Sequence, residues 1–249
     1  MGINTRKTVA MYKEVEGRWG RCKFFAKDEY VGKSMYYYGE YGPDETELIL
    51  TLAEESAGCC LDIGANIGVI SQALLATGHR VHAFEPQPEV YKLLVENMSN
   101  AGGAYTHHNT AIGSEAGTAE MPKVHYSAKG NFGGLSIGSN SIYGTYPVPV
   151  VTIDSYEFPD VGFMKIDVEG FELEVLQGAV ETITRYKPIM YIEDDRTDKS
   201  RVLRQKIEEL GYTFEEHYPT LYREDNFFGL KKNIWDKNYA SHNLICRPC

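Results

Sequence analysis

Leu-Asp-Ile-Gly-Ala-Asn-Ile-Gly at residues 61–68 and Val-His-Ala-Phe-Glu-Pro at residues 81–86 are the two stretches that decide the fold. The first is an apolar run that enters a glycine-rich turn, and the second is an apolar run that ends in an acid, with a helical pattern between them. Glu85 follows Gly64 by 21 positions (85 minus 64). That is close to the spacing of about 20 at which an acid after the second strand accepts hydrogen bonds from ribose hydroxyls. The two stretches therefore predict an α/β domain that opens with a nucleoside-binding site.

The glycine turn favours one class of nucleoside cofactor over another. Asp62 comes near the end of the first strand, and Gly64 and Gly68 let the backbone turn sharply and approach a ligand. A dinucleotide fingerprint, G-x-G-x-x-G, requires glycine where this chain has Asn66, so NAD and FAD fit less well. S-adenosylmethionine has a ribose and an amino acid tail but no pyrophosphate, and it fits better. An NAD-dependent oxidoreductase and a non-catalytic cofactor-binding module remain the alternatives.

Apolar runs alternate with helical periodicity along most of the remaining chain. Strands are predicted at residues 59–63, 81–84, 105–109, 162–168, 188–193, 212–216 and 243–246, and helices at 69–77, 89–100, 172–179 and 199–210. Residues 113–151 interrupt this order and are rich in Gly, Ser, Tyr and Asn, so we expect an antiparallel insertion or flap there. We predict one α/β domain over residues 1–249, with residues 1–50 as an N-terminal extension or lid.

Two of the later predicted strands end in carboxylates. Asp167 closes one strand with Glu169 just beyond it, and Glu193 and Asp194 close the next. Because open α/β folds bind ligands at the carboxyl edge of the sheet, Asp167 and Glu169 are candidate catalytic residues. Asp167 could instead cap the following helix or pair with Lys165. Glu193 and Asp194 could either line the site or act as local caps.

Composition narrows the classes of partner. The 249 residues carry a formal net charge of −10, which disfavours nucleic acid, since phosphate binding depends on clustered Lys and Arg. Five cysteines, an odd number that includes the adjacent Cys59 and Cys60, favour reduced buried thiols and a cytoplasmic protein. No apolar run is long enough to span a bilayer, so no membrane partner is expected.

A set of motifs, taken in order, resembles one known family. The motifs are Asp-Ile-Gly-Ala-Asn-Ile-Gly at 62–68, Phe-Glu-Pro at 84–86, Asn-Thr-Ala-Ile-Gly at 109–113, Val-Thr-Ile-Asp-Ser at 151–155, Met-Lys-Ile-Asp-Val-Glu-Gly at 164–170 and Glu-Val-Leu-Gln-Gly-Ala at 174–179. They are similar to those of the FkbM family of S-adenosylmethionine-dependent methyltransferases, over roughly residues 40–195. The resemblance implies a seven-stranded, Rossmann-like class I methyltransferase fold with a mainly parallel sheet. It also implies an enzyme of the EC 2.1.1 class that methylates a hydroxyl of a small molecule, sugar or glycan.

The resemblance assigns roles to individual residues. It places the methionine end of the cofactor against the 62–68 motif, the ribose at Glu85, the adenine near residues 109–112, and the departing methyl group nearest Asp167. The implied cofactor-binding residues are Asp62, Gly64, Asn66, Gly68, Glu85, Pro86, Thr110, Ala111, Ile112 and Asp167. Upstream, Tyr41 and Glu45 could close over the cofactor or could lie on the surface.

Methyl transfer to an aliphatic hydroxyl also requires removal of a proton. Asp167 and Glu169 are the candidate general bases, since a positioned carboxylate typically contributes about 10² to 10⁴ in rate. As an alternative, one or both could ligate a hard divalent metal that acidifies the hydroxyl. No ligand spacing in the sequence indicates such a site, and we expect no metal.

Recognition of the acceptor is expected from the loops rather than from the motifs. The N-terminal segment contains the stretch Tyr-Tyr-Tyr-Gly-Glu-Tyr at residues 36–41. The 113–151 segment contains Asn-Phe-Gly-Gly-Leu-Ser at residues 131–136, with Tyr143 and Tyr146. Their flat faces and polar tips suit a carbohydrate or aromatic acceptor, although ordinary packing would use the same residues. The sequence leaves the acceptor and the oligomeric state undefined.

Overall fold

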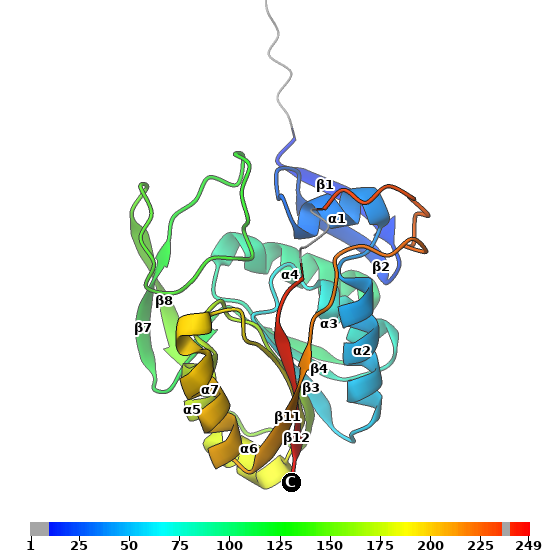
Figure 1. Ribbon diagram of the computed structural model, residues 1–249. Helices are drawn as coiled ribbons and strands as arrows, with labels where there is room; N and C mark the ends of the chain where they lie inside the picture. The colour runs from blue at the N-terminus through cyan, green and yellow to red at the C-terminus, as the bar shows by residue number, and fades with distance from the viewer. Residues whose placement is uncertain (1–9, 236–239) are drawn as a thin grey trace, which may run out of the picture.

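The computed structural model describes residues 10–235 and 240–249, and a seven-stranded sheet lies at its centre (Figure 1). The strands are β3 (Cys59–Ile63), β4 (Val81–Phe84), β5 (Tyr105–His108), β9 (Val161–Ile166), β10 (Ile189–Glu193), β11 (Tyr212–His217) and β12 (Asn243–Pro248). Their order across the sheet is β11-β12-β10-β9-β3-β4-β5. The pairs from β10 to β5 are parallel, and β12 is antiparallel to both β10 and β11. All seven strands predicted from the sequence are confirmed, with ends that shift by up to two residues.

Helices cover both faces of this sheet, which explains why its strands are almost continuous apolar runs. On one face lie α2 (Pro43–Glu54), α3 (Val69–Ala76) and α4 (Pro88–Ala101), and on the other lie α5 (Glu172–Gln177), α6 (Val180–Tyr186) and α7 (Thr197–Glu209). Because side chains alternate along a strand, Leu61 packs under α5–α7 and Cys60 packs under α2–α4. Asp62 shares the face of Cys60 and therefore lies beneath α3. Within the described ranges, no helix is long and apolar enough to cross a membrane.

The N-terminal part of the chain forms a small layer over α4. Strands β1 (Tyr12–Gly17) and β2 (Gly20–Phe25) pair as an antiparallel hairpin, and α1 (Val31–Tyr38) packs against them. Asn97 of α4 accepts a hydrogen bond from Lys23 N (2.8 Å) and donates to Lys23 O (2.9 Å) and Ile67 O (2.7 Å). One buried amide therefore joins the hairpin to the glycine turn. Helix α2, also within the predicted 1–50 extension, packs on the sheet, and residues 1–9 of that extension lie outside the described residues.

The segment at residues 113–151 is built largely from an antiparallel hairpin, as predicted. Its strands β7 (Gly117–Pro122) and β8 (Thr145–Val151) pair with each other, and β8 also pairs in parallel with the short β6 (Ala111–Ile112). Figure 1 draws this hairpin in green beside the central sheet. A single 3₁₀ turn, η1 (Ile153–Ser155), leads from β8 toward β9.

Helix α6 is missing from the sequence prediction, which ended the preceding helix at residue 179 and placed no further helix before β10. The chain turns at Gly178, where an added Cβ would lie 2.0 Å from Gly113 O. The Asp154 carboxylate then accepts hydrogen bonds from Glu181 N (2.9 Å) and Thr182 N (2.8 Å). Asp154 caps the new helix from a distant part of the chain, a contact that the local sequence pattern does not contain.

Candidate functional site

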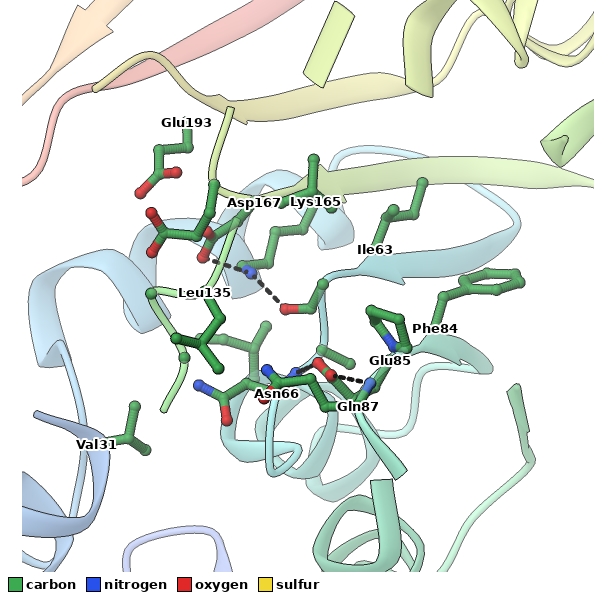
Figure 2. A pocket seen from close by; sticks show the side chains of 18 of the residues that line it. Val31, Ile63, Asn66, Phe84, Glu85, Gln87, Leu135, Lys165, Asp167 and Glu193 are labelled. Carbon is green, nitrogen blue, oxygen red and sulfur yellow. Dashed lines mark hydrogen bonds and ion pairs between the residues drawn. The ribbon is translucent and has the colours of Figure 1, made fainter. Parts of the chain in front are cut away.

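A pocket opens at the carboxyl ends of the parallel strands (Figure 2), which is where open α/β folds bind ligands. The lining follows the strands in turn: Gly64–Asn66 after β3, Phe84–Gln87 from the end of β4, Thr110–Ile112 after β5, Asp167–Glu169 after β9, and Glu193, Asp195 and Arg196 from the end of β10. Val31, Tyr41 and Glu45 contribute from the N-terminal helices and their connection, and Gly133–Leu135 contribute from the insertion. The pocket therefore combines the sheet edge with two segments that cover it.

The glycine turn lies tightly against the ends of two neighbouring strands. Gly64 has φ of +80°, and a Cβ added there would lie 1.8 Å from Asp167 O. The amides of Gly64 and Ala65 both donate to Phe84 O, at 3.0 and 2.9 Å. Asn66 has φ of +52°, a left-handed conformation that asparagine tolerates better than most residues. The turn is therefore held by the backbone of β4 and leaves no space for a side chain at position 64.

Glu85 lies at the bottom of the same part of the pocket. Its side chain is buried, and its two oxygens accept hydrogen bonds from Asn66 N (3.0 Å) and Gln87 N (2.8 Å). Burial raises the pKa of Glu85 to about 7, although these bonds and the charge of Lys165 oppose the rise. Each carboxylate oxygen has two lone pairs, so both oxygens can still accept a hydrogen bond from a ligand.

A buried lysine organises the acids at the next strand. Lys165 Nζ lies 2.9 Å from Asp167 Oδ2 and 3.8 Å from Asp62 Oδ1. Burial acts to lower the pKa of Lys165, but the carboxylates of Asp167, Asp62 and Glu45 outweigh it and raise that pKa above its usual value. Asp62 Oδ2 also accepts a hydrogen bond from Ser71 Oγ (2.6 Å). The pairing of Asp167 with Lys165, considered from the sequence, is present, and Asp167 still lines the pocket.

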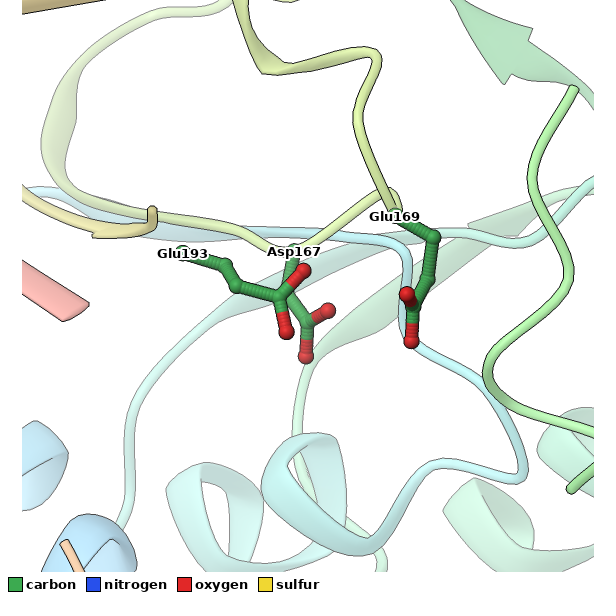
Figure 3. A group of neighbouring side chains, drawn as sticks. All are labelled: Asp167, Glu169 and Glu193. Atoms are coloured by element: carbon green, nitrogen blue, oxygen red, sulfur yellow. The ribbon is translucent and has the colours of Figure 1, made fainter. Parts of the chain in front are cut away.

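Three carboxylates converge beside this lysine (Figure 3). One oxygen from each of Asp167, Glu169 and Glu193 lies within 4.8 Å of the others. Arg196 Nη2 pairs with Glu169 Oε2 at 2.8 Å. Burial, and then the charge of Asp167, raise the pKa of Glu169 to about 7, and the same two causes raise the pKa of Glu193. This cluster makes one side of the pocket acidic, whereas other parts of the pocket wall are apolar.

The two acidic side chains at the end of β10, Glu193 and Asp194, lie in different surroundings. Glu193 lines the pocket, whereas Asp194 turns inward and accepts hydrogen bonds from Ser200 Oγ and Arg204 Nε, both at 2.8 Å. Glu193 therefore lines the site, as one of the two alternatives left open by the sequence has it, whereas Asp194 is bound by side chains of α7 and caps no backbone amide among the hydrogen bonds of the described residues.

The predicted site residues can now be placed one by one. Gly64, Asn66, Glu85, Pro86, Thr110, Ala111, Ile112, Asp167 and Glu169 line the pocket, as do Tyr41 and Glu45. Asp62 and Gly68 are absent from the lining among the described residues. Asp62 is fully buried beneath α3, and Gly68 begins α3, where an added Cβ would meet Leu94 Cδ1 at 2.7 Å. Their assignment to the cofactor remains a prediction that this pocket geometry does not support.

Other lining residues were missed from the sequence. Lys165 was noted only as an ion-pair partner, although a lysine inside a buried strand is itself a signal of a nearby acid. Gln87 is buried and donates to Phe132 O (3.0 Å), which connects the turn after β4 to the insertion. Of the aromatic residues suggested for the acceptor, Tyr41 lines the pocket. Tyr36 and Tyr37 are exposed, and Tyr38 and Phe132 are buried, so these four do not line it.

Comparison with protein families and curated proteins gives one concordant result. A model described as the methyltransferase FkbM domain matches residues 62–214, which is more than half of the chain. Hexuronic acid methyltransferase AglP of Haloferax volcanii is 32% identical over 140 residues. That match covers 56% of this chain and 57% of the relative, so the chain spans less than two thirds of the length of that protein.

Solved structures agree on the fold. Magnesium protoporphyrin IX methyltransferase of Synechocystis, with bound S-adenosylmethionine, gives a TM-score of 0.51 at 9% identity, over 91% of this chain and 87% of that one. A tRNA (uracil-54, C5)-methyltransferase of Pyrococcus abyssi, in complex with S-adenosylhomocysteine, gives a TM-score of 0.51 at 10% identity, over 96% of this chain and 44% of that one. At such identities the likeness shows the fold alone. It confirms the Rossmann-like, seven-stranded α/β architecture with a mainly parallel sheet.

Proposed function

The chain belongs to the FkbM methyltransferase domain family, and from that membership we propose that it transfers a methyl group from S-adenosylmethionine to a hydroxyl oxygen of a carbohydrate. The observation that carries the proposal is the pocket at the carboxyl edge of the sheet, where the glycine turn, Glu85 and Asp167 meet. When bound, the cofactor supplies an electrophilic methyl carbon on a sulfonium.

The chemistry of the lining fits this cofactor. Glu85 has free lone pairs for the ribose hydroxyls, and Gly64 and Asn66 line the part of the pocket proposed for the methionine end. Residues 110–112 supply a small, largely apolar surface for the adenine. The sulfonium and the ammonium of the cofactor are cations, and they suit a pocket that holds Glu45, Asp167 and Glu193. Asn66 replaces the central glycine of a dinucleotide fingerprint, which disfavours NAD.

Asp167 and Glu169 are the proposed catalytic residues. The ion pair with Lys165 fixes the position of Asp167 at the sheet edge. Glu169, with a pKa of about 7, is suited to take up a proton from an acceptor near neutral pH. Because Arg196 pairs with Glu169 and also donates to Ser136 Oγ (3.1 Å), it holds this carboxylate at the edge of the insertion.

Support for a carbohydrate acceptor comes from the name of the Haloferax relative, a hexuronic acid methyltransferase. Arg196 lines the acidic side of the pocket and adds a positive charge there. A small acceptor is also consistent with the enclosing insertion and with a chain of net charge −10, which disfavours polyanionic nucleic acid.

The test is calorimetric titration with S-adenosylhomocysteine and, separately, with NAD. We expect binding of S-adenosylhomocysteine near micromolar, about −8 kcal/mol, and a loss of about tenfold or more in Glu85→Gln. Glu89→Gln is the matched control, because Glu89 lies on α4 beside the site but pairs only with Lys92 among the described residues. Absence of binding, or a preference for NAD, would overturn the cofactor assignment.

An acceptor screen separates an enzyme from a module that only binds the cofactor. Methyl transfer from labelled S-adenosylmethionine should be measured on uronic acids and on the matching neutral sugars. Turnover on either set supports the proposed reaction, and higher turnover on uronic acids supports the same acceptor class as the relative. Cofactor binding with no transfer to any hydroxylated acceptor supports the non-catalytic alternative.

A further inference from the structure

The three carboxylates at the edge of the pocket have a geometry that the proposed reaction alone does not explain. We infer that Asp167, Glu169 and Glu193 bind a hard divalent cation. Asp167 and Glu169 lie in the turn that follows β9, and Glu193 ends the neighbouring parallel strand β10, so the sheet itself sets their spacing. Figure 3 shows all three side chains pointing into one space.

The spacing fits one ion. Oxygens from the three residues lie within 4.8 Å of one another. Two oxygens on opposite sides of a bound ion are about 4.2 Å apart for Mg²⁺ and about 4.6 to 5.2 Å apart for Ca²⁺, as twice the metal–oxygen distance. Carboxylate oxygens are ligands that suit hard cations such as Mg²⁺, Ca²⁺ and Mn²⁺.

Two of the acids have an oxygen to spare. Asp167 uses Oδ2 for Lys165, and Glu169 uses Oε2 for Arg196. The ion pairs therefore orient both carboxylates and leave Asp167 Oδ1 and Glu169 Oε1 for another ligand. The positive side chains of Lys165 and Arg196 also offset part of the negative charge of the cluster. We therefore expect a dissociation constant for the metal ion between micromolar and millimolar rather than a permanently bound ion.

Glu193 provides the independent evidence for a ligand. Its Oε2 atom is buried and has no hydrogen-bond donor among the described residues, and no lysine, arginine or histidine of those residues lies within ion-pair distance. A buried carboxylate oxygen without a partner is costly, because it loses hydration and gains nothing in return. Figure 3 shows the Glu193 carboxylate beside that of Asp167. A cation between these acids would supply the missing partner.

The place of the ion in the pocket suggests its use. A cation there would lie beside the carboxylates proposed to act on the acceptor, and a hydroxyl bound to it would lose its proton more readily. This use rests on the proposed methyl transfer, whereas cation binding itself does not. The ion would also let an acidic pocket accept a negatively charged sugar, because it would screen the carboxylates from that charge.

The experiment is a titration with Mn²⁺ alone, followed by the electron paramagnetic resonance signal of the free ion. The protein is studied without cofactor or acceptor. The wild-type protein should bind one Mn²⁺ per chain, and Mg²⁺ or Ca²⁺ should displace it. Glu193→Gln should weaken binding about tenfold or more. The control is Glu174→Gln, because Glu174 also has a buried oxygen without a partner among the described residues but lies on α5, outside the cluster.

Thermal unfolding measurements distinguish a loss of cation binding in Glu193→Gln from a loss of folding. Glu193→Gln removes repulsion among the acids, so the metal-free variant should be at least as stable as the wild-type protein. Mn²⁺ should raise the melting temperature of the wild-type protein and of Glu174→Gln, but not that of Glu193→Gln. No saturable binding up to about 10 mM, beyond the weakest protein sites for such ions, would overturn the inference. Equal binding by Glu193→Gln would do the same, and displacement of Mn²⁺ by S-adenosylhomocysteine would overturn the use of the ion in methyl transfer. Titration of S-adenosylhomocysteine in the presence of a chelator tests the proposed function separately.

Discussion

Replacement of Gly64 by alanine should separate the two strands that support the pocket. An added Cβ would lie 1.8 Å from Asp167 O, and real Cβ contacts are essentially never shorter than 3.0 Å. The backbones of β3 and β9 must therefore move apart by about 1.2 Å, which stretches the 3.0 Å hydrogen bond from Asp167 N to Ile63 O. A lost buried hydrogen bond costs about 1 to 3 kcal/mol. The left-handed φ of +80° adds about 1 to 2 kcal/mol for a residue with a side chain.

The expected loss in unfolding free energy is therefore about 2 to 5 kcal/mol, measured by urea denaturation. Gly78→Ala is the matched control, because Gly78 has φ of +92° but no atom within 4 Å of its added Cβ. That variant should lose only the conformational part, about 1 to 2 kcal/mol. Gly64→Ala should also lose binding of S-adenosylhomocysteine, while Gly78→Ala should keep it. Equal destabilisation by the two substitutions would refute the argument that close approach, rather than backbone conformation, requires glycine at position 64.

Three further outcomes follow from the structure. Asp194→Asn removes a buried charge bound to Arg204 and Ser200, and urea denaturation should show a loss of about 2 to 3 kcal/mol; an unchanged midpoint would contradict this role. Burial raises the pKa of both Glu45 and Glu85 from 4.5 to about 7, so the folded state holds protons that the unfolded chain releases, and stability should fall as pH rises from 5 to 8 by up to about 3 kcal/mol for each group. The double variant Glu45→Gln with Glu85→Gln should flatten this dependence, and a slope unaffected by it would disprove the assignment. Four cysteines are buried and Cys249 is exposed, so one thiol per chain should react rapidly with a disulfide reagent before unfolding and five after it; several fast thiols in the folded protein would show that the burial is wrong.

The central sheet could be predicted from the sequence because the patterns that specify its strands and turns are local. A strand buried on both faces must be apolar along its length, and a turn that meets a neighbouring strand must contain glycine. The N-terminal hairpin was not predicted, because strands such as Tyr12–Gly17 mix charged and apolar residues and are stabilised by distant partners, including Asn97. Helix α6 was missed for the same reason, since its cap, Asp154, lies in another segment.

The sequence predicts that the candidate site lies at the ends of the strands, but it predicts less well which side chains line the pocket. Asp62 and Asp167 both come at the ends of buried strands, yet only Asp167 lines the pocket. Alternation along β3 places Asp62 with Cys60 under α3, and this reasoning was available from the sequence. Glu193 is different, because its convergence with Glu169 depends on the register of β9 with β10, which single-strand patterns do not contain.

The position of β12 has a consequence for the order in which the protein can assemble during synthesis. This strand leaves the ribosome after the other six, yet it lies between β10 and β11 rather than at the edge of the sheet. Until it emerges, β10 has an open edge and β11 has no partner in the sheet, so the nascent chain presents unpaired backbone groups beside the acidic end of the pocket. Such an edge is a site where another chain can pair, so nascent chains that lack β12 should aggregate or recruit chaperones more than the complete chain. Translation pauses shortly before residue 243 would lengthen that exposure.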